Sequence, residues 1–293
     1  MSIGADAMCF QCHMNRYLEV ARQYGDEKTA TAFARDLMRL YIDFPEDAGS
    51  PELTPQVTEL LSKYYGLDPD RLRPEKEASN RFVLERLPQI QAMVESAEDP
   101  LFAALQCAVL GNYLDFSALQ GKVSFEELEQ KLRSGLQLDI DKACYETFRK
   151  DLEKGRRVLI LTDNAGEIGF DRVLAQQIKK AFPQAEITFC VRGGPVVNDA
   201  TREDAAFMQI EFPVIDNGAP ISATVLRLLG DEAKAAMDSA DVIIAKGMAN
   251  TETLYGCGYP VYYAFLVKCN RIKTFFDKPM MTPMFVKDPN CET

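Results

Sequence analysis

Hydrophobic positions follow one pattern up to about residue 150 and a different one beyond it. In the first part they recur every three or four residues, as on one face of an α-helix, and strand-like alternation is almost absent. From about Gly155 onward, short apolar runs alternate with helical stretches, and the runs cover residues 158–161, 187–191, 212–215, 242–245 and 261–267. Alternation of short apolar strands with helices predicts a parallel sheet that is covered by helices on both faces.

Capping residues mark where helices of the first part begin. Thr54-Pro55 and Asp99-Pro100 each combine an N-cap residue with proline at the first helical position, and Ser124–Glu127 matches a capping box. We therefore expect an α/β protein with a three-layer α/β/α, Rossmann-like and mostly parallel sheet and an N-terminal all-helical domain. The helical cap domain is predicted to comprise residues 1–150 and the α/β/α domain residues 151–293.

Composition narrows the classes of partner. Apolar residues make up 47% and charged residues 26% of the 293 positions, as in ordinary globular proteins. The formal net charge of -11 argues against nucleic acid as a partner, because binding its backbone requires clustered Lys and Arg. The sequence contains no signal peptide pattern and no apolar run approaching the ~20 residues of a membrane span. We expect a reduced, cytoplasmic protein without a membrane partner; the oligomeric state cannot be predicted from the sequence.

Three polar loops follow predicted strands, and the first follows the run 158–161. It carries Asp163, Asn164 and Glu167, with Gly166 allowing close approach of the backbone. Ligands of open α/β sheets bind at the carboxyl ends of strands, and hard oxygen ligands suit a divalent cation such as Mg²⁺ or Mn²⁺. An ordinary helix-capping role for Asp163 and Asn164 is the alternative.

The second and third loops add cations and further acidic groups. Arg192 can bind a phosphate or carboxylate through two hydrogen bonds, Gly193 permits close backbone approach, and Asp199 is a further hard ligand. The third loop begins at Lys246, which carries a point charge suited to phosphate, and also contains Asn250 and Glu252. Because right-handed crossovers bring all three loops to one edge of the sheet, this arrangement predicts a metal-bridged phosphate ester.

Motifs of competing enzyme classes are missing from the sequence. It contains neither G-x-G-x-x-G after a strand nor G-x-x-x-x-G-K-[ST], which disfavours dinucleotide and P-loop sites. A G-x-S-x-G elbow is also missing, and a single histidine, His13, makes a Ser-His-Asp triad implausible. Phosphate-ester chemistry with a metal therefore remains the favoured interpretation.

Two features of the helical part have chemical and structural interpretations. Cys9 and Cys12 form a Cys-x-x-Cys pair, a possible second metal or redox site, which a structural zinc ion would need His13, Cys257 or Cys269 to complete. Packing on one helix face explains the same spacing. Asn112 and Asp115, at the end of an apolar helix, are read as capping and turn residues if nothing else is known.

Six segments of the chain, in order from Cys9 to Ile272, together resemble one known family. They are CFQC, LGNYLDF, LTDNAGEIGFD, VRGGPVVNDAT, ADVIIAKGMANTETL and FLVKCNRI. They are similar to the DUF89 family of metal-dependent damage-control phosphatases, in its Cys-x-x-Cys-bearing prokaryotic branch. The resemblance implies a helical domain on an α/β/α domain and phosphatase activity on sugar phosphates or damaged phosphometabolites.

The resemblance also implies site residues. A divalent ion (Mn²⁺, Co²⁺, Ni²⁺ or Mg²⁺) would be held by Asp163, Asn164 and Asp199. Lys268 lies where a related branch carries a lysine that holds substrate phosphate, and Asn112 and Asp115 fall in a block that the family places near the cleft.

We therefore predict a metal-dependent phosphatase acting on a small phosphorylated metabolite, with the α/β/α domain binding metal and phosphate. The ion would lower the pKa of a bound water. The residues predicted to bind substrate are Asn112, Asp115, Arg192, Gly193, Lys246, Asn250 and Lys268. Glu167 or Glu252 would orient the water or protonate the leaving alkoxide, and attack by Asp163 itself, giving an aspartyl-phosphate, is the alternative.

Two other classes of function stay open. One is an S-adenosylmethionine-dependent carboxyl methyltransferase, an activity also attributed to a branch of this family; the lack of a glycine-rich first loop counts against it. The other is a non-catalytic metal- or redox-sensing protein centred on Cys9 and Cys12.

Overall fold

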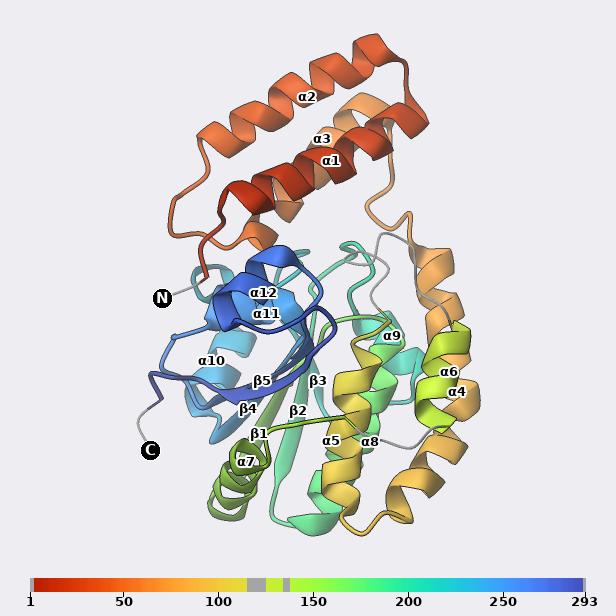
Figure 1. Ribbon diagram of the computed structural model, residues 1–293, viewed down its shortest axis with the longest axis vertical. Coiled ribbons are helices and arrows are strands. Elements are labelled where there is room, and N and C mark those ends of the chain that lie inside the picture. Colours follow the sequence, from red (N-terminus) through yellow and green to blue (C-terminus); the bar gives the residue numbers. More distant parts are fainter. Residues whose placement is uncertain (1–2, 115–124, 134–137, 292–293) are drawn as a thin grey trace.

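The computed structural model describes residues 3–114, 125–133 and 138–291 (Figure 1). Six strands form one sheet in the order β3-β2-β1-β4-β5-β6. Strands β1 to β5 run parallel to one another, and β6 runs antiparallel to β5. Their bounds are β1 (Arg157–Leu161), β2 (Glu186–Val191), β3 (Val214–Asp216), β4 (Val242–Lys246), β5 (Val261–Leu266) and β6 (Pro283–Lys287). The prediction of a mostly parallel α/β sheet is confirmed, and β6 is the strand that the sequence pattern did not indicate.

Helices cover both faces of the sheet because its central strands are apolar on both sides. Every residue of β4 and β5 is buried, and alternate residues of each strand enter different core clusters. One face packs against α4 (Arg73–Glu95), α5 (Pro100–Gly111), α6 (Phe125–Arg133), α7 (Lys142–Lys154), α8 (Glu167–Ala181) and α9 (Arg202–Phe207). The other packs against α10 (Asp231–Ser239), α11 (Gly247–Leu254) and α12 (Asn270–Phe276).

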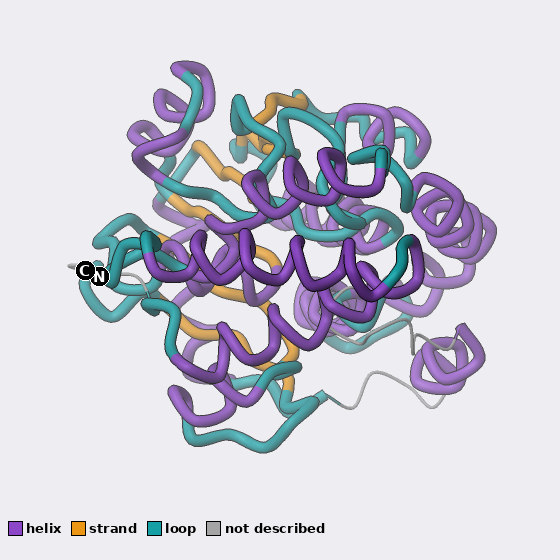
Figure 2. Tube along the Cα trace, turned by 90° about the horizontal axis from the view of Figure 1, so that it is seen from above, coloured by secondary structure: helices purple, strands orange, loops and turns teal. Residues whose placement is uncertain are grey.

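The first three helices have a core of their own. These are α1 (Ala7–Tyr24), α2 (Glu27–Ile42) and α3 (Thr54–Tyr65), with the short 3₁₀ helix η1 (Ser50–Leu53) before α3. They lie together at one end of the sheet, at the top of Figure 1, and extend across the strands when seen from above (Figure 2). Helices α4 to α7, in contrast, pack into the same core as the sheet. The division into domains of residues 1–150 and 151–293 stays a prediction.

Predicted helix starts can be compared with the structure at two places. Asp99 caps α5 as expected, its carboxylate accepting a hydrogen bond from the Phe102 N–H at 3.1 Å. The prediction of Thr54 as the N-cap of α3 is wrong by one residue: Leu53 is the cap and Thr54 the first helical residue, because the Thr54 hydroxyl donates to the Pro51 carbonyl instead of capping the helix. Ser124, of the expected capping box, lies outside the described residues. No helix within the described ranges is long and apolar enough to cross a membrane.

Candidate active site

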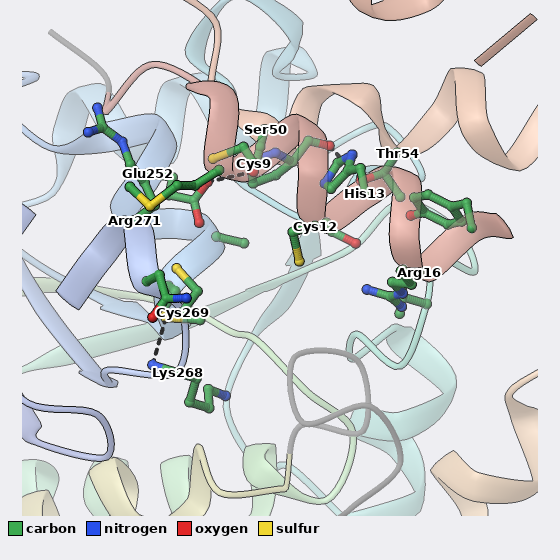
Figure 3. A pocket seen from close by; sticks show the side chains of 18 of the residues that line it. Cys9, Cys12, His13, Arg16, Ser50, Thr54, Glu252, Lys268, Cys269 and Arg271 are labelled. Carbon is green, nitrogen blue, oxygen red and sulfur yellow. Dashed lines mark hydrogen bonds between the residues drawn. The ribbon is translucent and has the colours of Figure 1, made fainter. Parts of the chain in front are cut away.

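A cavity of about 500 Å³ lies between the carboxyl ends of the strands and the helix α1. On the sheet side it is lined by residues of the loops that follow the strands, among them Asp163, Asn164, Asn198, Asp199, Lys268 and Cys269, and by Glu252 of α11. On the other side it is lined by residues of α1 and η1, among them Cys9, Gln11, Cys12, His13, Asn15, Arg16 and Ser50. Figure 3 shows Cys9 and Cys12 across the cavity from Lys268 and Cys269. Parallel strands bring their polar ends to one edge, and α1 closes that edge into a pocket.

Asp163 and Asp199 are brought together by the loops that follow β1 and β2. Asn164 and Asp199 form an isolated antiparallel β-bridge, and the Ala200 N–H donates to the Asp163 carbonyl at 2.8 Å. Arg192 lies between the two carboxylates: its Nε is 2.6 Å from Asp199 Oδ2 and its Nη2 is 3.7 Å from Asp163 Oδ1. The carboxylate side chains are only 7% and 6% exposed. Two buried acids thus share one guanidinium.

Amide side chains orient the first of these acids, Asp163. The Nδ2 atoms of Asn112 and Asn164 donate to Asp163 Oδ2 at 2.9 and 2.7 Å, and Asn198 Nδ2 donates to Asn164 Oδ1 at 2.8 Å. The Oδ1 atom of Asn198 is buried and accepts no hydrogen bond. Asn198 therefore offers an oxygen at the cavity that sequence reasoning did not single out. Its place directly before Asp199 was the available signal.

Gly247 is needed beside Asp163 for steric reasons. It has φ of +79°, and a Cβ atom there would clash with both carboxylate oxygens of Asp163. Only glycine fits a backbone that is both left-handed and this close to the acid.

The chemistry of these residues fits a divalent cation. Asp163, Asp199 and the amide oxygens of Asn164 and Asn198 are hard oxygen donors, the kind that divalent cations such as Mg²⁺ prefer. Within the described ranges, no group of three or more His, Cys, Asp or Glu residues is placed to hold a metal. Among the described residues, two carboxylates and at least one amide oxygen are the hard donors brought together here.

Lys246 does not lie where the prediction of direct phosphate binding requires it. It is fully buried and is absent from the cavity wall, and its ammonium donates to the Ala108 carbonyl at 2.7 Å and to Glu167 at 2.6 Å and pairs with Asp171 at 2.8 Å. An ammonium has three hydrogens, so none remains for phosphate. Lys246 has the same parity along β4 as Val242 and Ile244, which face the α5/α8 layer.

Other predicted residues also lie behind the cavity rather than in its wall. Glu167 is fully buried, and Asn250 donates to the carbonyls of Leu161, Thr162 and Lys246 while accepting from Thr224 and Arg192. The Gly193 N–H is 2.8 Å from Asn217 Oδ1. Asn112 and Arg192 contact the two acids from behind the cavity wall. Asp115, which was also predicted to bind substrate, lies outside the described residues. Of the predicted substrate-binding residues, Asn112, Arg192 and Asn250 therefore contact the site from behind the cavity wall.

Lys268 and Glu252 do line the cavity. Lys268 follows β5, is 5% exposed, and donates from Nζ to the Asn112 carbonyl at 2.8 Å. The Glu252 carboxylate accepts from Ser50 Oγ at 2.8 Å. Burial raises the pKa of Glu252 to about 7, although the Ser50 hydrogen bond and Arg271 act in the opposite direction. The site thus contains a cation and a carboxyl group that titrates near neutral pH.

The Cys9 thiol beside the cavity resists ionisation. Burial raises the pKa of Cys9 to about 11, and all eight cysteines are free. His13 is held neutral, because burial lowers its pKa to about 4. A thiol with a raised pKa is a poor nucleophile at neutral pH, so nothing in this geometry favours redox chemistry at Cys9. Cys269 also lines the cavity, whereas Cys257 lies near Tyr263 and Asp288.

The fold and the site define an α/β protein with an oxygen-rich cluster at the carboxyl edge of its sheet, enclosed by N-terminal helices. The chain belongs to the family described as the damage-control phosphatase ARMT1-like domain, whose family model matches residues 5–281. The resemblance to the DUF89 family drawn from the sequence is thereby confirmed.

Individual relatives agree with this assignment. The chain is 34% identical over 206 residues to a damage-control phosphatase of Archaeoglobus fulgidus, covering 67% of this chain and 68% of that protein. It is 30% identical over 282 residues to an uncharacterized protein of Methanocaldococcus jannaschii, covering 92% and 91%. The crystal structure of a DUF89 family protein from Pyrococcus horikoshii superimposes with a TM-score of 0.83 at 25% identity, covering 97% of this chain and 99% of that one.

Proposed function

We propose that the protein is a metal-dependent phosphatase that hydrolyses phosphate monoesters of small metabolites, such as sugar phosphates or damaged phosphometabolites. The observation that carries the proposal is the convergence of Asp163 and Asp199 on Arg192 at the wall of a cavity that also contains Lys268. The name of the relative from Archaeoglobus fulgidus, a damage-control phosphatase, supports the same reaction.

Each cavity residue has a part in this proposal. Asp163, Asn164 and Asp199 would hold one divalent ion (Mn²⁺, Co²⁺, Ni²⁺ or Mg²⁺), which when bound lowers the pKa of water and offsets the charge of the phosphate. Lys268, on the same side of the cavity, would attract a phosphate oxygen. A carboxyl group with a pKa near 7 exists in both forms at neutral pH, so Glu252 is suited to protonating the leaving oxygen.

Water is the nucleophile in this proposal. Asp163 Oδ2 already accepts hydrogen bonds from Asn112 and Asn164, and the Gly247 backbone lies against the carboxylate. These contacts hold the group in one place, which suits a ligand better than a nucleophile that must move onto phosphorus.

The test is hydrolysis of p-nitrophenyl phosphate and of a panel of phosphorylated sugars, with each of the four ions and with EDTA. We expect Asp163→Ala to lower turnover by at least 100-fold while the protein stays folded, because this residue would be a metal ligand. Asp231→Ala, at an exposed position on α10, is the matched control and should retain wild-type turnover. Activity that survives EDTA, or unchanged turnover of Asp163→Ala, would contradict the proposal. Transfer of a methyl group from S-adenosylmethionine in the presence of EDTA would instead support the methyltransferase.

A further inference from the structure

Directly behind the candidate metal site, Lys246, Glu167 and Asp171 form a group that is sealed from solvent. All three side chains have 0% exposure. Glu167 and Asp171 are four residues apart on α8 and so lie on the same face of that helix. The Lys246 Nζ atom is 2.6 Å from Glu167 Oε1 and 2.8 Å from Asp171 Oδ1. Burying two acids and one ammonium carries a large desolvation penalty, so we expect this group to have a function.

Glu167 connects this group to the amides of the site. Its Oε2 atom accepts from Asn164 Nδ2 at 2.7 Å and from Asn112 Nδ2 at 3.1 Å. The same two amide groups donate to Asp163 Oδ2. Since the NH₂ end of Asn164 is held by two acceptors, its carbonyl oxygen must point the other way. That oxygen, Oδ1, accepts from Asn198, a residue of the cavity wall.

We infer that Lys246 is a positioning residue: by holding Glu167 in place it fixes the amide orientation of Asn164, and thereby the oxygen that Asn164 presents to the divalent ion. This inference rests on the proposed function. It differs from the role that the sequence suggested for Lys246, which was contact with substrate phosphate. Without the ammonium, Glu167 and Asp171 would face each other with no cation between them, and the Glu167 carboxylate would lose its position.

Asp171 provides the contrast that makes the inference specific. It pairs with the same ammonium as Glu167, but no amide of the site donates a hydrogen bond to either of its carboxylate oxygens. Glu167, and not Asp171, accepts the hydrogen bonds that Asn112 and Asn164 donate. Replacing Asp171 with asparagine keeps the shape of the group and leaves the pair of Lys246 with Glu167 intact. The chain therefore offers a matched variant that disturbs the buried charge without disturbing the path to Asn164.

The experiment measures the Mn²⁺ dissociation constant of the full-length protein by titration calorimetry, with thermal unfolding as a check of folding. Loss of a residue that orients a metal ligand weakens metal binding by about 10- to 100-fold. We expect this loss for Lys246→Met, and also for Glu167→Gln, which keeps the lysine and serves if Lys246→Met does not fold. Asp171→Asn should stay within about threefold of wild type. At saturating Mn²⁺, the KM for p-nitrophenyl phosphate should be unchanged in Lys246→Met.

Three results would overturn the inference. Wild-type Mn²⁺ affinity in Lys246→Met with a raised KM would show that Lys246 contacts phosphate. Equal weakening in Asp171→Asn and Lys246→Met would show that buried charge, rather than the path through Glu167, sets the affinity. A wild-type protein that binds none of Mn²⁺, Co²⁺, Ni²⁺ and Mg²⁺ would remove the proposed function itself, and the inference with it.

Discussion

We expect the ionised form of Glu252 to destabilise the fold at neutral pH, and replacing the residue with glutamine tests this directly. The side chain is 8% exposed and lies where α11 meets η1, within reach of Ser50, Arg271 and Asp6. Burial raises its pKa from 4.5 to about 7. Glutamine has the same shape, can accept the hydrogen bond from Ser50, and carries no charge at any pH.

The magnitude follows from linkage between protonation and folding. Each pKa unit corresponds to 1.36 kcal/mol, so a rise from 4.5 to about 7 amounts to about 3 kcal/mol. Between these two values the folded state binds the proton and the unfolded state has lost it. The stabilising contribution of protonated Glu252 is therefore complete below pH 4.5 and is lost as the pH rises through 7. Glu252→Gln should match wild type near pH 4.5 and exceed its free energy of unfolding by about 3 kcal/mol at pH 8.

The assay is urea unfolding of both proteins at pH 5 and pH 8, compared as a difference of differences so that other titrating groups cancel. Glu98→Gln, at an exposed position, is the control and should show no pH-dependent gain. A gain below 1 kcal/mol for Glu252→Gln between the two pH values would refute the reasoning. If Glu252 also donates the proton to the leaving group, the stabilised variant should lose about 100-fold or more in kcat, a trade-off typical of active sites.

Two further predictions concern the neighbours of the site. Gly247→Ala adds a methyl group against the Asp163 carboxylate at a left-handed position, so we expect Mn²⁺ affinity to fall by at least tenfold in calorimetry; wild-type affinity would show that Asp163 is not the ligand. The double substitution Cys9→Ser, Cys12→Ser should leave Mn²⁺ content and phosphatase turnover within about threefold of wild type. Loss of one equivalent of bound metal in that variant, measured by elemental analysis, would instead restore the thiol metal site.

Much of the fold was accessible from the sequence because burial on both faces makes a strand recognisable. The runs at 158–161 and 242–245 are apolar at every position, and they became β1 and the first four residues of β4, the central pair of the sheet. The strand β6 was missed because it begins with proline and lies at the edge of the sheet, where the pattern is weak.

For the site, too, the sequence was enough to place some residues, and only the tertiary structure placed others. The alternation of strands and helices was enough to place Asp163, Asn164 and Asp199 at one edge, because right-handed crossovers leave no other place for the carboxyl ends of parallel strands. Only the tertiary structure decided that Lys246 turns away from that edge. Strand parity directs its side chain to one face of the sheet, but which helix covers that face depends on packing between distant segments. On that face α8 supplies Glu167 and Asp171, and the Lys246 ammonium forms ion pairs with both of these acids.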